Sequence, residues 1–141
     1  MRALAFLIGL VLLAGCSGGA PLATERPLPD DATEADLVRA LALNGFSAET
    51  GVYRRLPLLD GPGRELRVRA AGDGHAFSYA GTLHVHPFDT PEDAEAALDE
   101  IDPTFDAVPP RVYLRGRLVV VYFGVGTDLP DTLYHLLGPP L

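Results

Sequence analysis

Two of the four histidines in this 141-residue chain, His84 and His86, are spaced for metal binding. They lie two residues apart in a segment that alternates apolar and polar residues, so both imidazoles are expected on one face of a strand. Imidazole binds zinc and copper well, and His75 or Asp89 is near enough in sequence to supply a third ligand. The alternative is a half-exposed, solvated strand face. We favour this alternative and expect no cofactor, because two ligands are too few for a stable metal site.

Residue patterns that would support catalysis are incomplete. Ser17, Ser47 and Ser78 lack Gly-x-Ser-x-Gly surroundings, so no serine nucleophile is assigned. Gly124-Val125-Gly126 lies where a dinucleotide-binding turn would begin, but Leu129 stands at the position of the third glycine. Glycines that end a buried strand explain this segment better. We therefore expect that the protein is not an enzyme. A hydrolase with catalytic groups from distant positions is the remaining alternative.

The chain is strongly acidic, with a formal net charge of −8 at pH 7 and no lysine. Nucleic-acid binding and electrostatic adhesion to anionic lipid both need local positive charge, so we expect neither. Carboxylates crowd one predicted helix opposite its apolar stripe, which is typical of a solvated helix face rather than of paired-carboxylate catalysis. These carboxylates belong to Glu92, Asp93, Glu95, Asp99 and Glu100.

The amino-terminal segment has the layout of a secretory signal, with Arg2, an apolar run over residues 3–14, Gly15 and then the only cysteine, Cys16. Its Leu13-Ala14-Gly15-Cys16 sequence resembles the lipobox of bacterial lipoproteins. The resemblance implies cleavage before Cys16, a diacylglycerol on the Cys16 sulfur and acylation of the new amino terminus. A transmembrane helix is the alternative, but spanning needs about 20 apolar residues and this run ends at Cys16.

The expected parts of the chain are a signal peptide over residues 1–15, the lipidated cysteine with a flexible tether over 16–31, and one globular domain over 32–141. The tether is rich in Gly and Pro and would reach on the order of 20 Å as a flexible coil. Lipidation of Cys16 leaves no thiol for a disulfide. Because two or more acyl chains anchor stably, we expect an exported protein held by lipid on the bacterial cell membrane or outer membrane.

Caps and apolar periodicity predict three helices. The first begins at the capping-box pattern Thr33 to Asp36 and ends at Asn44-Gly45, and the second begins at Thr90 with Pro91 in its first turn. The third begins near Thr127 or Asp128 and ends at Gly138. The expected buried stripes are Leu37, Val38 and Leu41; Ala94, Ala97, Leu98 and Ile101; and Leu129, Leu133, Leu136 and Leu137.

Alternation of apolar and polar residues predicts the strands. They are expected over residues 52–56, 65–71, 76–86, 111–114 and 117–123. The second and third should form a hairpin, with Phe77, Tyr79, Leu83 and Val85 on its apolar face. The last two should form another hairpin around Arg115-Gly116. Residues 118–123 are apolar on both faces, which predicts the central strand.

The order helix, strands, helix, strands, helix predicts an α+β domain, with a mainly antiparallel sheet of four to five strands and about three helices packed on one face. From Thr33 to Gly138 the arrangement resembles small bacterial lipoproteins of uncharacterised activity, above all in the Arg-Gly-Arg-Leu-Val-Val-Val-Tyr-Phe-Gly strand before a leucine-rich helix. We therefore expect a membrane-anchored envelope protein that acts as a non-catalytic binding module for a protein, polymer or small ligand. The alternative function is an envelope protein that binds zinc or copper through His75, His84 and His86.

Overall fold

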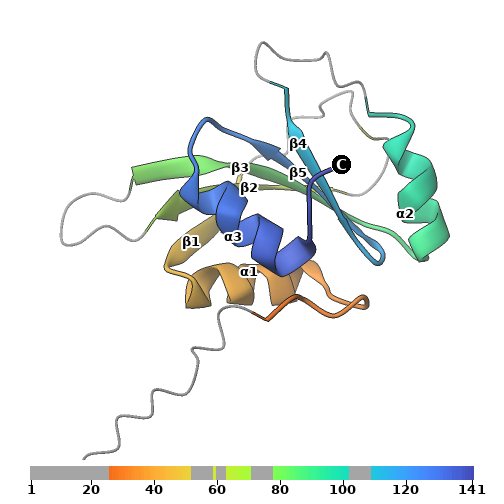
Figure 1. Ribbon diagram of the computed structural model, residues 1–141, viewed down its shortest axis with the longest axis horizontal. Helices are drawn as coiled ribbons and strands as arrows, with labels where there is room; N and C mark the ends of the chain where they lie inside the picture. Colours follow the sequence, from red (N-terminus) through yellow and green to blue (C-terminus); the bar gives the residue numbers. More distant parts are fainter. Residues whose placement is uncertain (1–25, 52–58, 60–62, 71–77, 102–108) are drawn as a thin grey trace, which may run out of the picture.

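Helices and strands follow one another in the order helix, three strands, helix, two strands, helix (Figure 1). The computed structural model describes residues 26–51, 59, 63–70, 78–101 and 109–141. Within these residues the helices are α1 (Glu34–Leu43), α2 (Pro91–Leu98) and α3 (Asp128–Leu137). The strands are β1 (Phe46–Thr50), β2 (Arg64–Ala70), β3 (Ser78–Pro87), β4 (Arg111–Arg115) and β5 (Leu118–Phe123). The predicted α+β fold class is confirmed.

The strands of the described part form one antiparallel sheet in the order β1-β2-β3-β5-β4. β2 pairs with β1 and β3, and β5 pairs with β3 and β4. Both predicted hairpins, β2 with β3 and β4 with β5, are therefore confirmed. β5 was expected to be the central strand. It lies in the interior of the sheet between β3 and β4, whereas β3 occupies the middle position.

Helices cover both faces of this sheet, in contrast to the single helical face that the sequence predicts (Figure 1). α1 and α3 pack on one face, where Val120 of β5 joins the larger core. The residues on either side of it, Val119 and Val121, pack with Ala94 and Ala97 of α2 in a second core. Successive residues of a strand point to opposite faces, so a strand that is apolar on both sides must be covered on both. This requirement places α2 opposite α1 and α3.

A β-bulge in β3 overturns the predicted facing of Tyr79. The register with β2 shifts by one residue beside Gly81, where φ is 151°. A Cβ at Gly81 would collide with the Tyr122 ring, so a glycine is required there. Tyr79, expected on the apolar face, is 62% exposed, and its hydroxyl lies 2.6 Å from Thr82 Oγ1. Phe77, the other residue expected on this face near the bulge, lies outside the described residues.

The helices begin at the predicted caps. Thr33 Oγ1 accepts a hydrogen bond from the Asp36 N–H at 3.3 Å, and Asp36 Oδ2 accepts one from the Thr33 N–H at 3.0 Å. Thr90 Oγ1 likewise accepts a hydrogen bond from the Asp93 N–H at 3.1 Å, with Pro91 in the first turn of α2. No helix among the described residues is both long enough and apolar enough to cross a bilayer.

Strand β1 has no counterpart among the predicted strands. Gly45 takes a φ of 80° at the end of α1, which turns the chain directly into Phe46 at the start of β1. Only Phe46 of the five residues in β1 is buried, so the strand shows no clear alternation. The strand expected over residues 52–56 lies outside the described residues.

The packed domain starts earlier than the boundary expected at residue 32. Leu28 is 7% exposed and belongs to the larger core. Its N–H donates to the Leu136 carbonyl at 2.8 Å, and its own carbonyl accepts from Arg115 Nε at 2.6 Å. Arg115 Nε also lies 3.2 Å from a carboxylate oxygen of Asp30. Leu28 and Asp30, which composition assigns to the tether, are therefore held against α3 and the β4–β5 hairpin.

This boundary can be tested with the substitution Leu28→Ala. Because Leu28 is buried, the truncated side chain should leave a partly filled site and lower the free energy of unfolding by about 2 kcal/mol. Leu43→Ala is the matched control, since Leu43 is 57% exposed and the same truncation should cost less than about 0.5 kcal/mol. Chemical denaturation measures both values. Equally small losses of unfolding free energy in the two variants would show that Leu28 belongs to the tether and not to the packed domain.

Candidate functional site

The two histidines of the predicted metal site, His84 and His86, are buried, each with 3% of its surface exposed. In the register with β5 they lie opposite Val121 and Val119, which belong to the core under α2. The expectation of a half-exposed, solvated strand face is therefore wrong. The core that contains Leu59 and residues of α2 covers this face of the sheet, and alternation within one strand gives no sign of such a cover.

A buried carboxylate accompanies the histidines, and we call Glu65, His84 and His86 the histidine cluster. Glu65 of β2 is 9% exposed, lies opposite His84 in the register, and pairs with Arg67 through Oε1 and Nε at 3.5 Å. The Phe123 ring meets the His84 ring edge-on, with centroids 5.2 Å apart. The cluster is thus enclosed by apolar groups on the β5 side.

Burial decides the charge of both imidazoles. Burial lowers the pKa of His84, although the negative charge of Glu65 acts in the opposite direction. Burial, with a smaller contribution from the neighbouring His84, lowers the pKa of His86 to about 4. A low-dielectric surrounding disfavours the charged form of an imidazole. Both histidines are therefore mainly neutral at pH 7.

The surroundings of the histidines limit how they can bind a metal. A Cβ at Gly63 would lie 2.5 Å from His86 Nδ1, so the Gly63 backbone packs closely against this ring and leaves no room for a side chain at position 63. In the part of the chain that the structure describes, no three His, Cys, Asp or Glu side chains are grouped for metal binding. His75 lies outside that part, and Asp89 is exposed. The structure thus brings His84 and His86 to one face, with Glu65 rather than Asp89 opposite His84.

The Gly124-Val125-Gly126 segment packs around Tyr122. A Cβ at Gly124 would collide with the Tyr122 hydroxyl, and this hydroxyl donates to the Ala80 carbonyl at 3.2 Å. Glycine at position 124 therefore makes room for a buried tyrosine, which supports the interpretation of these glycines as the end of a buried strand.

The remaining predicted residues fall into three groups. The carboxylate-bearing residues Glu92, Asp93, Glu95, Asp99 and Glu100 are all exposed, so the solvated helix face is confirmed. Cys16, the predicted lipidation site, and Ser17 lie outside the described residues. Ser47 is half-buried in β1, and Ser78 is the first residue of β3.

A cleft of about 710 Å³ lies between α1, α3 and the segment that precedes α1. Arginines from three separate parts of the chain line it, namely Arg26, Arg39 and Arg115, together with apolar side chains such as Leu43 and Leu136. We call this the arginine cleft. Its volume is typical of sites for small ligands, which range from about 300 to 1,000 Å³. The sequence contains no motif for it, because only the fold brings these arginines together.

Some charged side chains of the arginine cleft already form hydrogen bonds or ion pairs in the part of the chain that the structure describes, and others do not. Arg115 is held by Leu28 and Asp30, as described above. Asp36 is the acidic residue of the lining. Hydrogen bonds from the Thr33 side chain and backbone, with the charge of Arg39, lower the pKa of Asp36, so it stays ionised. Arg26 and Arg39 are exposed, and no ion pair engages either of them within the described residues. The cleft can therefore offer two guanidinium groups to an anion.

Acid should destabilise the fold through the histidine cluster. The pKa of His86 is about 4 in the folded chain against an ordinary 6.5, so between these values the unfolded chain takes up a proton that the folded chain excludes. The free energy of unfolding should therefore fall as the pH drops from 6.5 to 4, by about 3 kcal/mol for a shift of this size. Chemical denaturation across this pH range measures the loss.

The variant His86→Gln keeps a neutral polar side chain at this position, so it should flatten the pH dependence. His135→Gln is the matched control, because His135 is exposed on α3 and its replacement should leave the dependence unchanged. An acid-induced loss of the same size in His86→Gln and in the parent chain would contradict the assignment to His86.

Comparison with known proteins assigns no family to the chain. No protein-family model matches it. No curated protein and no solved structure matches it either. The roles of its residues therefore follow from their position, burial and charge.

Proposed function

We propose that this protein is a lipid-anchored protein of the bacterial envelope that binds a partner without catalysing a reaction. The observation that carries the proposal is the Leu13-Ala14-Gly15-Cys16 sequence after an apolar run, which resembles a lipobox. Acyl chains such as palmitate on Cys16 and its amino group would hold the protein at the cell membrane or outer membrane. Anchoring raises the effective concentration near other membrane-bound proteins, so weak contacts suffice for binding.

The chemistry of the arginine cleft supports binding rather than reaction. Its polar lining consists of three guanidinium groups, the Asn44 amide and a carboxylate. Guanidinium groups stay protonated and act as hydrogen-bond donors to anions. The Asn44 amide donates to the Ala40 carbonyl at 2.8 Å, and the carboxylate of Asp36 is engaged in the helix cap. These groups suit the recognition of an anionic or polar ligand.

Exposed tyrosines offer surfaces for a protein partner. Tyr79 is 62% exposed and Tyr134 is 52% exposed. Tyrosine is enriched at protein interfaces because it combines a large apolar area with a hydroxyl group. A partner in the envelope is therefore expected to contact one of these side chains.

A second candidate is the binding of zinc or copper by His84 and His86, with His75 as the third ligand. The observation that favours it is the placement of two neutral imidazoles on one sheet face, whereas His75 lies outside the described residues. Neutral imidazole is the form that binds a metal. If the purified protein contains stoichiometric zinc or copper and His84→Gln loses it, metal binding is the function and the proposal of a binding module is wrong.

Lipidation is tested by Cys16→Ala. This variant loses the only cysteine of the chain, so labelled fatty acid should no longer be incorporated. The precursor should stay uncleaved by the lipoprotein peptidase, or another peptidase should release the protein. Ser17→Ala, which alters the neighbouring residue and keeps the thiol, should be labelled like the parent. Acyl label on Cys16→Ala would contradict the lipobox interpretation.

Partner binding is tested by in-cell photocrosslinking. A photoreactive residue at Tyr79 or Tyr134 should give a reproducible adduct with one envelope protein, and Cys16→Ala should reduce its yield because the anchor supplies the local concentration. The same group at Glu95, on the acidic face of α2, is the control. Adducts of equal yield with and without Cys16, or from all three positions alike, would count against a specific anchored partner.

A further inference from the structure

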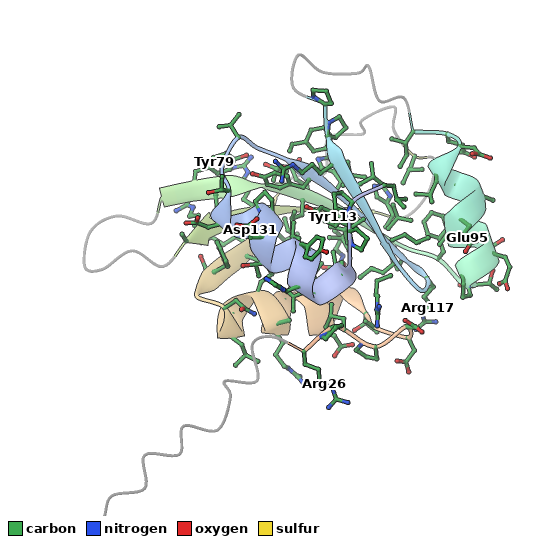
Figure 2. All side chains as sticks on the ribbon, in the orientation of Figure 1. Arg26, Tyr79, Glu95, Tyr113, Arg117 and Asp131 are labelled. Carbon is green, nitrogen blue, oxygen red and sulfur yellow. The ribbon has the colours of Figure 1, made fainter. Side chains whose placement is uncertain are left out.

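The arginine cleft concentrates positive charge in a chain whose net charge is −8. Its lining carries Arg26, Arg39 and Arg115 against one acidic residue, Asp36, and Asp30 pairs with Arg115 beside the cleft. The exposed carboxylates of α2 lie on the other side of the sheet from α1 and α3. Figure 2 shows Arg26 and Glu95 on separate sides of the molecule. The fold thus places the arginine cleft and the acidic helix α2 on opposite sides of the sheet.

The apolar groups of the cleft make its rim amphipathic. Leu43, at the end of α1, is 57% exposed beside the cleft. Arg39 lies one helical turn earlier on the same face, because residues four apart in a helix are neighbours. A guanidinium group next to an exposed leucine suits the boundary between lipid headgroups and acyl chains.

The cleft also lies close in sequence to the proposed anchor. Arg26 lies ten positions after Cys16, so the two residues are at most about 35 Å apart even in a fully extended chain. If Cys16 carries lipid, the arginine cleft must stay within this distance of the bilayer. Arginine is well suited to phosphate because its planar guanidinium can donate two parallel hydrogen bonds.

We infer that the arginine cleft docks on anionic phospholipid headgroups of the membrane that holds the anchor, with Arg26 and Arg39 binding headgroup phosphate and Leu43 entering the interface. The inference rests on the proposed lipid anchor. Docking directs α2 away from the bilayer, where its carboxylates avoid repulsion by anionic lipid. The anchor thus fixes the location of the domain, and the cleft fixes its orientation.

The test uses the mature lipidated protein in vesicles of phosphatidylcholine, with and without phosphatidylglycerol. Acylated Cys16 is the only native cysteine, so a fluorophore can be attached to one introduced cysteine, either Leu43→Cys or the control Glu95→Cys. With phosphatidylglycerol present, lipids that carry a quencher near the headgroup should quench the fluorophore at position 43 several-fold more strongly than the one at position 95.

Two double variants show whether the arginines of the cleft cause this difference. Arg26→Gln with Arg39→Gln should abolish the difference in quenching between positions 43 and 95. Arg64→Gln with Arg67→Gln removes the same charge from β2 and should preserve it, because both side chains are more than half exposed away from the arginine cleft. Thermal melting verifies that all variants remain folded.

The outcomes separate the inference from the anchor on which it rests. Acylated protein that floats with the vesicles but shows equal quenching at positions 43 and 95 would overturn the docking and leave the anchor intact. Quenching that is independent of phosphatidylglycerol, or that falls equally in both double variants, would overturn it as well. If the protein carries no acyl label, the proposed lipid anchor itself is contradicted.

Discussion

The burial of β5 on both faces is the constraint on which the rest of the fold depends. Leu118 to Tyr122 are all buried, and alternate residues of this strand enter the two separate cores. Helices α1 and α3 cover one face of the sheet, and α2 covers the other. Because every residue of β5 pairs with β3, the cover over Val119 and Val121 extends to the neighbouring positions of β3. The burial of His84 and His86 is a consequence of this two-sided cover.

The same topology explains how the arginine cleft forms. Arg115 ends β4 at the turn into β5, and the turn brings it to residues 28 and 30, more than 80 positions earlier in the sequence. Arg39 reaches the cleft from α1, which packs with α3 in the larger core. A net charge of −8 therefore coexists with a local excess of cations. Composition alone argues against contact with anionic lipid, because it averages over charges that the fold separates.

Much of the fold could be predicted from local signals. The helix starts at Thr33 and Thr90 follow from side-chain caps, which depend on residues three apart, and the hairpins follow from alternation and turns. Features that depend on distant residues could not be predicted in this way. The bulge beside Gly81 accommodates the Tyr122 ring, and Leu28 is fixed by Leu136 and Arg115. In the candidate sites, the shared face of His84 and His86 could be predicted, whereas Glu65 and the arginine cleft could not.

The attachment of Leu28 determines how a mechanical load would enter the domain. Among the described residues, a pull from the amino-terminal side is first resisted at residue 28, whose two backbone groups are bonded to α3 and to the β4–β5 hairpin. The load is therefore shared with elements near the other end of the sequence before it reaches α1. Force applied from the amino-terminal side is therefore shared by the sheet and α3. As a result, α1 is not the first element to detach.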